Sequence, residues 1–366
     1  MIMEVFVQGI GIVGGFGTGM ETFSKTLANG LSETQVVTVQ TPNGTKEMPA
    51  FLADTSGLEA FVQKKTLRRM DHYSRMGLLG AYLALEDAGV LDIDRRHLGI
   101  VVASGYGASR STCAFLDSFI EGNDAFSSPT HFSNSVHNAA AANISITLGV
   151  TGPCLTVSQF EMSVPSALIS TIEWLKEGRV EKVLFGALDE YCDVLGYCWH
   201  RFHGHQRGIV VDPFLFHEQT AILGEGAVFF LLSLEQGTRT PYGRITDVNT
   251  QCTDGFECPD TDRNIFILGA DGHKTWGQQY ERYVTRNMKI ASYTPLYGSF
   301  PTNMAFDMAA AFSSLIIRKI YAPAAGISCP SSLNIIKEEQ HLDVEKICCL
   351  KFASNGESGT ITITHG

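Results

Sequence analysis

The sequence predicts an α/β protein whose sheets are buried on both faces, and two patterns support that prediction. Short apolar runs that contain or end at glycines occur at 5–15, 98–107 and 182–189, as expected of strands covered on both sides. Amphipathic segments at 74–89 and 164–178 each end at a glycine, the residue that often follows the last turn of a helix. Alternation of buried strands with helices is typical of layered α/β folds.

A second and shorter α/β half follows the first. The last apolar run of the first half, at 227–235, gives way to a more polar stretch rich in turn residues. A helical run at 307–320 and strand-like segments near the end of the chain come next. We therefore predict two halves, residues 1–235 and residues 236–366.

Composition narrows the class of protein. Of 366 residues, 44% are hydrophobic and 18% are charged, which suits a chain with a large core. The 38 acidic side chains outnumber the 27 basic ones, so the formal charge of -11 argues against general binding of nucleic acids. No apolar run reaches the roughly 18 residues that a membrane helix needs, and the first residues lack the basic start of a signal peptide.

The cysteines and histidines predict no metal centre. Nine cysteines are scattered without CxxC pairs, as expected of reduced thiols, and we predict a cytoplasmic protein. His200, His203 and His205 are closely spaced, but no cysteine or carboxylate stands at a ligand spacing from them. We therefore predict surface histidines, no metal and no cofactor.

Four segments, in order along the chain, carry a family resemblance. They are RRMDHYSRMGLLGAYLALEDAG (68–89), HFSNSVHNAAAANISITLGVTGPCLTVS (131–158), VVDPFLFHEQTAILGEGAVFFLLSLE (210–235) and SNGESGT (354–360). Together they resemble the β-ketoacyl synthase branch of the thiolase-fold condensing enzymes. This resemblance implies a five-layered α-β-α-β-α core made of two pseudo-repeated halves. The chain is shorter than typical relatives, mostly in its second half.

The resemblance also shows where catalytic residues should stand. The family uses a cysteine to carry the acyl chain and two histidines to promote decarboxylation and stabilise the enolate. Its Thr-Val-Ser-x-x-Cys-x-Ser motif aligns with TVSQFEMS and places Glu161 at the cysteine. The first histidine position falls on Asp271, although a slipped register would bring His273 there instead. At the second position stands Thr302 or a neighbour, with no histidine near it in the sequence.

The C-terminal loop adds a fourth departure from the family pattern. In the family, the backbone N–H groups of the cysteine and of a loop residue form an oxyanion hole. The corresponding residues here are Glu161 and Glu357, whose carboxylates would oppose negative charge that develops nearby. An acyl-glutamate would be an anhydride, too labile to hold a growing chain. Condensation by this chain alone is therefore not expected.

This set of losses resembles the chain length factors, or KSβ subunits, of type II polyketide synthases, whose relatives also occur in aryl polyene pathways. The resemblance implies a non-catalytic subunit that pairs with a cysteine-bearing ketosynthase (KSα) and shapes the tunnel limiting product length. Its partners would be that ketosynthase and the acyl carrier protein that bears the growing chain. Two alternatives stay open. One is a malonyl-carrier decarboxylase or divergent condensing enzyme with displaced catalytic residues, and the other is a homodimeric acyl-binding protein.

The same resemblance indicates which residues face the tunnel. The segment 105–122 should lie along it, with Ser109, Thr112, Phe115 and Leu116 as candidate gating residues. An ordinary helix core would explain Phe115 and Leu116 equally well.

A basic cluster offers a candidate docking site for the carrier protein. Lys64, Lys65, Arg68 and Arg69 stand where synthases of this family present basic residues to an acidic carrier. A solvated helix start explains the same cluster. If only one subunit of a pair docks the carrier productively, we expect it to be the KSα subunit.

Overall fold

One mixed sheet runs through the computed structural model, which describes residues 4–92, 94–122, 127–203, 210–237, 239–261 and 264–366. The first half of the chain supplies β1 (Val5–Gly14), β5 (Leu98–Ala103), β6 (Cys154–Val157), β7 (Lys182–Asp189) and β8 (Gly226–Ser233). The second half supplies β9 (Gly243–Cys252), β10 (Asn264–Leu268), β11 (Lys289–Ala291), β13 (Asn334–Ile335), β15 (Lys346–Phe352) and β16 (Glu357–Thr364). Their order is β13-β11-β10-β15-β16-β9-β1-β8-β7-β5-β6.

The two halves of this sheet meet where β1 pairs antiparallel with β9 over a few residues at its start. In the first half, β5, β6 and β7 run parallel, while β8 is antiparallel to both β7 and β1. In the second half, β10 is parallel to β11 and β15, and β16 is antiparallel to its neighbours. The remaining described strands form short pairs. Strand β2 (Gly17–Thr18) pairs with β1, β3 (Gln35–Thr41) pairs with β4 (Gly44–Ala50), and β12 (Lys319–Ile320) pairs with β14 (Gln340–His341).

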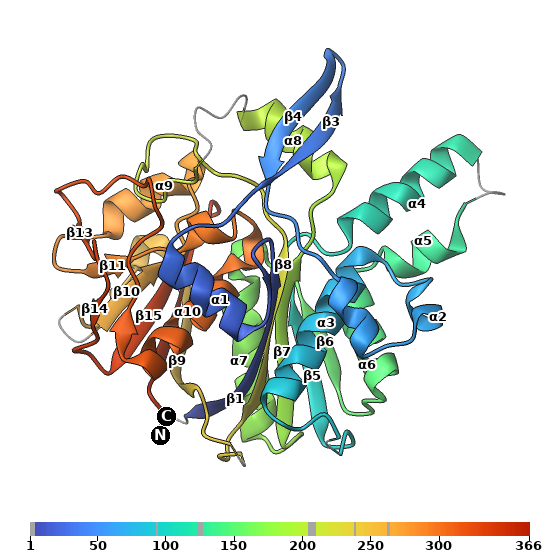
Figure 1. The fold of residues 1–366 in the computed structure, drawn as a ribbon, viewed down its shortest axis with the longest axis horizontal. Coiled ribbons are helices and arrows are strands. Elements are labelled where there is room, and N and C mark those ends of the chain that lie inside the picture. Colours follow the sequence, from blue (N-terminus) through green and yellow to red (C-terminus); the bar gives the residue numbers. More distant parts are fainter. Residues whose placement is uncertain (1–3, 93, 123–126, 204–209, 238, 262–263) are drawn as a thin grey trace.

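Helices cover the sheet on the outside and separate its two halves. They are α1 (Met20–Asn29), α2 (Lys64–Leu67), α3 (His72–Asp87), α4 (Ser109–Gly122), α5 (Pro129–Asn134), α6 (Ala139–Leu148), α7 (Ser163–Lys176), α8 (Asp193–His203), α9 (Lys274–Tyr283) and α10 (Met304–Ile317). Helices α3 and α6 pack on the outer face of the first half, and α9 packs on the outer face of the second. Helices α7 and α10 lie between the halves and contact strands of both (Figure 1). This arrangement confirms the expected α-β-α-β-α layering.

The main core lies in the middle layer. Residues of α7 and α10 pack there against the inner faces of both sheet halves. Every residue from Met304 to Leu315 is buried, as expected of a helix that is apolar nearly all round. Asp307 is the acidic exception within that stretch.

Most of the expected elements are present within a few residues of their predicted bounds. The runs at 5–15 and 182–189 form β1 and β7, and the helices expected at 74–89 and 164–178 are α3 and α7. Gly89 and Gly178, expected to end these helices, have φ of +70° and +65°, the left-handed region that glycine adopts without strain.

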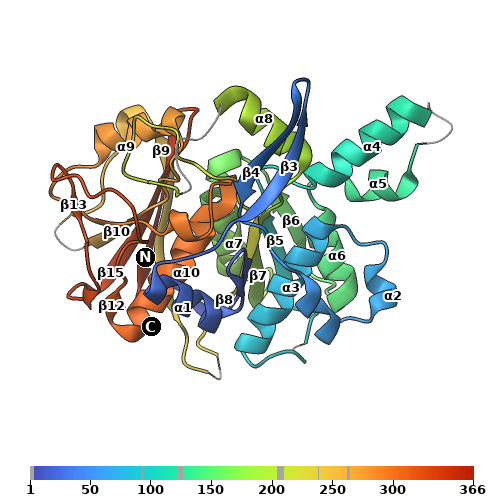
Figure 2. The ribbon, with the colours of Figure 1, turned by 45° about the horizontal axis from the view of Figure 1, so that its top comes forward.

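Two parts stand away from the layered body. The β3–β4 hairpin projects on one side, next to α8, and the pair of helices α4 and α5 projects on another (Figures 1 and 2). Segment 105–122, expected to face the tunnel, thus consists of a turn followed by the protruding α4. Among the described residues, no helix has both the length and the apolar character needed to cross a membrane.

Candidate functional site

Glu161 lies at the entrance to α7, in the short 3₁₀ helix Phe160–Met162 that leads into it. Its side chain is 8% exposed. Burial raises the pKa of the Glu161 carboxyl, while the ammonium of Lys351 acts in the opposite direction. A thiolate at this place would be stabilised by the start of the helix. Burial of the Glu161 carboxyl has the opposite effect, because it shifts the group toward its protonated form.

Asp271, the residue expected at the first histidine position, is an ionised carboxylate with partners on both oxygens. Ser299 Oγ donates to Asp271 Oδ2 at 2.8 Å, and Trp276 Nε1 donates to Oδ1 at 2.9 Å. Lys351 Nζ lies 3.4 Å from Oδ2. Burial alone would raise the pKa of Asp271, but the Lys351 ammonium and these hydrogen bonds bring it below its usual value.

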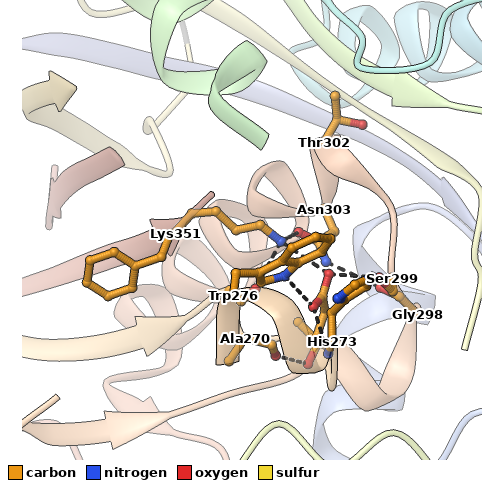
Figure 3. A network of polar contacts seen from close by, with 12 residues as sticks. Ala270, His273, Trp276, Gly298, Ser299, Thr302, Asn303 and Lys351 are labelled. Carbon is orange, nitrogen blue, oxygen red and sulfur yellow. Dashed lines mark hydrogen bonds and ion pairs between the residues drawn. The ribbon is translucent and has the colours of Figure 1, made fainter. Parts of the chain in front are cut away.

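Lys351 supplies the cation of this network, and its side chain is fully buried. Its Nζ donates to Asn303 Oδ1 at 2.7 Å and to the Gly269 carbonyl at 3.0 Å (Figure 3). Sequence reasoning missed Lys351, although a signal was present. After its exposed first residue, Lys346, the strand KICCLKF is otherwise apolar and buried, and a lysine inside such a strand requires an acidic or polar partner.

A third carboxyl, Asp307 on α10, lies near the same ammonium. The Tyr297 hydroxyl donates to Asp307 Oδ1, while Asp307 Oδ2 is buried without a hydrogen-bond partner. Burial raises the pKa of Asp307 to about 7, although Tyr297 and Lys351 lower it. The pocket therefore holds more buried carboxyls than cations, and protons compensate part of the difference.

Thr302 stands apart from this network (Figure 3). Its backbone N–H and its hydroxyl donate to Asp189 Oδ2 at 3.1 and 2.9 Å. The other oxygen of Asp189 accepts hydrogen bonds from the turn after β5, including the backbone N–H of Tyr106 at 2.7 Å. Burial raises the pKa of Asp189 to about 6. Thr302 therefore links the entrance of α10 to the end of β7.

Ser299 is the residue of the α10 entrance that contacts Asp271. The sequence prediction placed Thr302 or a neighbour at the second histidine position. A histidine pair must converge on one reacting centre, and Ser299 meets Asp271 whereas Thr302 is bonded to Asp189. The assignment of Thr302 or a neighbour to the second histidine position stays a prediction; Ser299, three residues before Thr302, contacts Asp271, and Asn303, the next residue after Thr302, accepts a hydrogen bond from Lys351.

Glu357, at the start of β16, is held by amide side chains. Gln159 Nε2 donates to both of its carboxylate oxygens at 3.1 Å, and Asn355 Nδ2 donates to Oε2 at 2.7 Å. The backbone N–H of Glu357 itself donates to Asn355 Oδ1 at 3.2 Å. The N–H group that the family would offer to an oxyanion is therefore already used.

His273, the alternative at the first histidine position, faces another histidine. Its Nε2 lies 3.1 Å from His203 Nε2, and its ring stacks on Trp276 with 3.6 Å between ring centroids. Because Nδ1 of His273 accepts the Thr275 backbone N–H, Nε2 carries the proton and donates to His203. Burial lowers the pKa of His273 to about 4, so this pair is neutral near pH 7.

The prediction of surface histidines is wrong for His203, because its ring packs between Trp199 and His273. The end of α8 carries it against the start of α9, a contact that sequence spacing cannot show. His200 is half-buried, and His205 lies outside the described residues. Within the described ranges, no group of three or more potential ligand side chains could hold a metal ion.

The candidate gating residues all lie on α4. The Ser109 hydroxyl donates to the Tyr106 carbonyl at 2.8 Å, and Thr112 Oγ1 lies 2.9 Å from the Ala108 and Ser135 carbonyl oxygens. The Phe115 ring packs on Phe132 of α5, and Leu116 is 49% exposed. Leu116 is thus not a core residue of this chain. A gating role for the four stays a prediction.

The basic cluster is exposed, with Lys64 and Lys65 on α2 and Arg68 and Arg69 directly after it. Lys64 Nζ forms an ion pair with Glu59 at 2.9 Å. Exposed pairs of this kind contribute little to stability. Docking of a carrier protein on this cluster stays a prediction.

Comparisons with known proteins identify the family. The family described as "Beta-ketoacyl synthase, N-terminal domain" matches residues 3–237, which is well over half of the chain. The chain belongs to the β-ketoacyl synthase family. It is 27% identical over 242 residues to "Putative polyketide beta-ketoacyl synthase 1" of Streptomyces virginiae, a match that covers 63% of this chain and 57% of that protein. Matches to further curated relatives cover from 38% to 60% of their lengths.

Solved structures agree over the full length of the chain. "The ishigamide ketosynthase/chain length factor" superposes with a TM-score of 0.83 at 17% identity, covering 100% of both chains. "Ketosynthase (ApeO) in Complex with its Chain Length Factor (ApeC) from Xenorhabdus doucetiae" gives 0.80 at 14% identity, covering 100% of this chain and 98% of that one. At these identities the likeness shows the fold, which is the thiolase-like ketosynthase fold.

Proposed function

We propose that this chain is a non-catalytic chain length factor that pairs with a catalytic ketosynthase in a type II polyketide synthase. One observation carries the proposal: Glu161, which the family motif aligns with the nucleophile, is buried close to the network of Lys351, Asp271, Ser299 and Asn303. An acyl group on the Glu161 carboxyl would be an anhydride, which is too labile to hold a growing chain. The subunit would act instead through the wall that it contributes to its partner's tunnel.

The chemistry of the pocket supports the loss of condensation. We place Asp271 at the first histidine position and Thr302 or a neighbour at the second, where neither can act as a histidine does toward a developing enolate. The nearby His273 is turned toward His203 and is neutral. The Glu357 N–H is occupied by Asn355.

An exposed surface supports a partner subunit. Strand β6 lies at the end of the sheet and pairs with β5 alone among the described strands. The protruding α4 and α5 carry exposed apolar side chains, among them Ile120 at 74% and Phe132 at 60%. Unpaired strand edges and large apolar patches mark association surfaces. Structural neighbours named as ketosynthase and chain length factor pairs are consistent with this kind of partner.

The acyl carrier protein would come to the pair as the bearer of the growing chain. The exposed basic cluster at Lys64, Lys65, Arg68 and Arg69 is compatible with an acidic partner. Its electrostatic contribution would fall with rising salt. The proposal does not require the carrier to dock on this subunit.

A reconstitution experiment tests the proposed function. The purified chain is given malonyl-carrier protein and an acyl primer, first alone and then with the cysteine-bearing ketosynthase encoded beside it. We expect no decarboxylation and no condensation alone, mixed dimers by native mass spectrometry, and chain extension only with both subunits. A partner ketosynthase whose cysteine is replaced by alanine serves as the control and should abolish extension.

The open alternatives predict different results. Turnover by the chain alone that Glu161→Ala abolishes would show a decarboxylase or a divergent condensing enzyme. Persistent homodimers, with no mixed species in the presence of the ketosynthase, would favour a homodimeric acyl-binding protein. Either result would overturn the proposed function.

A further inference from the structure

Phe160, the residue before Glu161, combines an unfavourable backbone conformation with an exposed ring. Its φ is +43°, in the left-handed region, and its side chain is 61% exposed. Bulky residues rarely adopt this conformation, and such strain persists where it serves a function. In the isolated chain, the ring gains little burial in return. The combination indicates a contact that the isolated chain does not make.

The surroundings of Phe160 fix its position but cover only part of its ring. A side chain on Gly105 would come within 3.2 Å of Phe160 Cα, so the Phe160 backbone is packed against the turn after β5. The Tyr106 ring, in the same turn, meets the Phe160 ring edge to face, with 6.5 Å between centroids and 72° between planes. The ring is therefore held in one direction, with most of its surface open. A rigid, supported aromatic side chain is well suited to insert into a partner.

Other exposed apolar side chains lie on elements near β6, the last strand of the sheet. Strand β6 ends at Val157, three residues before Phe160, and α6, which packs on β6, exposes Ile146 at 80%. Val136, in the turn between α5 and α6, is 45% exposed. We call Phe160, Val136, Ile146 and the outer edge of β6 the edge face. The edge face therefore comprises exposed apolar side chains and, along β6, backbone groups that have no strand partner among the described residues.

The strand edge indicates the kind of partner that fits the edge face. An exposed ladder of N–H and C=O groups is best satisfied by the edge of another strand. A partner of the same fold presents the corresponding edge strand, so that the two sheets can join across a two-fold or pseudo-two-fold axis. Such pairing would bring the partner's surface over Phe160 as well.

We propose that Phe160 is an anchor residue of the interface with the catalytic ketosynthase subunit, its ring inserted into a pocket of that subunit beside the joined strand edges. This inference rests on the proposed function, because it takes that subunit as the partner. It adds a role for a residue beside the lost nucleophile. On this inference, the strained backbone at Phe160 serves association with the ketosynthase subunit and does not serve the folding of this chain.

Two variants and a matched control separate these roles. Phe160→Gly removes the ring and relieves the backbone, since glycine adopts positive φ freely. Phe160→Ala removes the ring and keeps a Cβ. Phe202→Ala removes an aromatic ring on α8 that is also largely exposed, at 79%. The melting temperature of each isolated variant and its dissociation constant with the purified ketosynthase subunit are then measured.

We expect Phe160→Gly to melt at the same temperature as the wild type or higher, and its dissociation constant to rise at least about 30-fold, as for an interface hot spot. Phe160→Ala should lose pairing to a similar extent, and Phe202→Ala should change neither quantity. Wild-type affinity in both Phe160 variants would overturn the inference and leave the proposed function intact. A lowered melting temperature for Phe160→Gly would also overturn it, since the ring would then serve the fold. Failure of the wild-type chain to pair with the ketosynthase would overturn both.

Discussion

Replacement of Lys351 by methionine should destabilise the protein strongly, although it touches no residue proposed to contact a partner. Methionine keeps most of the apolar length of the side chain and removes the ammonium group. Lys351 is fully buried, and its Nζ lies 2.7 Å from Asn303 Oδ1 and 3.4 Å from Asp271 Oδ2. Without it, the Asp271 carboxylate stays buried with neutral donors only.

The expected loss in the free energy of unfolding follows from these contacts. Removal of one partner of a buried ion pair costs about 3 to 5 kcal/mol, because the remaining charge is left uncompensated. Asn303 and the Gly269 carbonyl also lose a donor, each at about 1 kcal/mol. Ser299 and Trp276 continue to donate to Asp271, which limits the loss. We therefore expect the free energy of unfolding to fall by about 3 to 5 kcal/mol.

A double-mutant cycle isolates the charge pair. Asp271→Asn should also destabilise, because it removes the carboxylate that pairs with the Lys351 ammonium and leaves nearby only Glu161 and Asp307, whose pKa values burial raises. The double variant, Lys351→Met with Asp271→Asn, buries no charge at this pair. The double variant should therefore lose less free energy of unfolding than the two single variants lose in sum, and the difference should be about 2 kcal/mol.

Urea unfolding at pH 7, followed by circular dichroism, measures the three variants. Lys346→Met, at the exposed start of the same strand, is the control and should change stability by less than about 0.5 kcal/mol. A loss below about 1 kcal/mol for Lys351→Met would refute the reasoning. So would strictly additive losses in the cycle, because they would mean that the two charges do not interact.

Three further predictions concern the same pocket. Glu161→Cys places a thiol at the start of α7 but should give no condensation with malonyl-carrier protein and an acyl primer. In the part of the chain that the structure describes, no free imidazole stands beside it, and product formation would contradict this prediction. Burial raises the pKa of Asp189 to about 6 and of Asp307 to about 7. The folded state therefore binds more protons than the unfolded state between about pH 4 and pH 7, and stability should fall as pH rises through that window. Asp307→Asn should reduce this slope in urea unfolding at pH 5 and pH 7.5, and an unchanged slope would exclude Asp307 as a source. Gly105→Ala would place a Cβ 2.3 Å from Pro301 Cβ and should cost about 1 to 3 kcal/mol, measured by thermal unfolding against the wild type.

Local patterns were sufficient to predict the α/β class and most of its strands and helices. Buried strands such as β1 and β7 can be predicted from short apolar runs. Helices α3 and α7 can be predicted from amphipathic segments that end at Gly89 and Gly178. These signals depend on neighbours in the sequence, because periodicity and terminal glycines reflect the local backbone. The layering of α7 and α10 between two sheet halves came from the family resemblance, since no local pattern says which helix lies in the middle.

The candidate site was predictable only where it follows a motif. Glu161 stands in a segment whose neighbours fit the family pattern, so the motif predicts its position, whereas the weaker motif around Asp271 left His273 as an alternative. The direction in which a side chain points within such a segment could not be predicted from the sequence. Ser299 and Thr302 are three residues apart, yet one contacts Asp271 and the other contacts Asp189.

What the sequence by itself determined is the fold class, because its signals lie in residues that are neighbours along the chain; that Glu161 stands where the family has its nucleophile is a prediction from the motif around it. The tertiary structure decided how the altered pocket is held together. Lys351 is 80 residues from Asp271 in the sequence, and only the parallel pairing of β10 with β15 brings it to that carboxylate. The exposure of Phe160 likewise depends on which surfaces pack around α7. Burial and long-range contact are properties of the folded chain, since they arise from where distant segments meet.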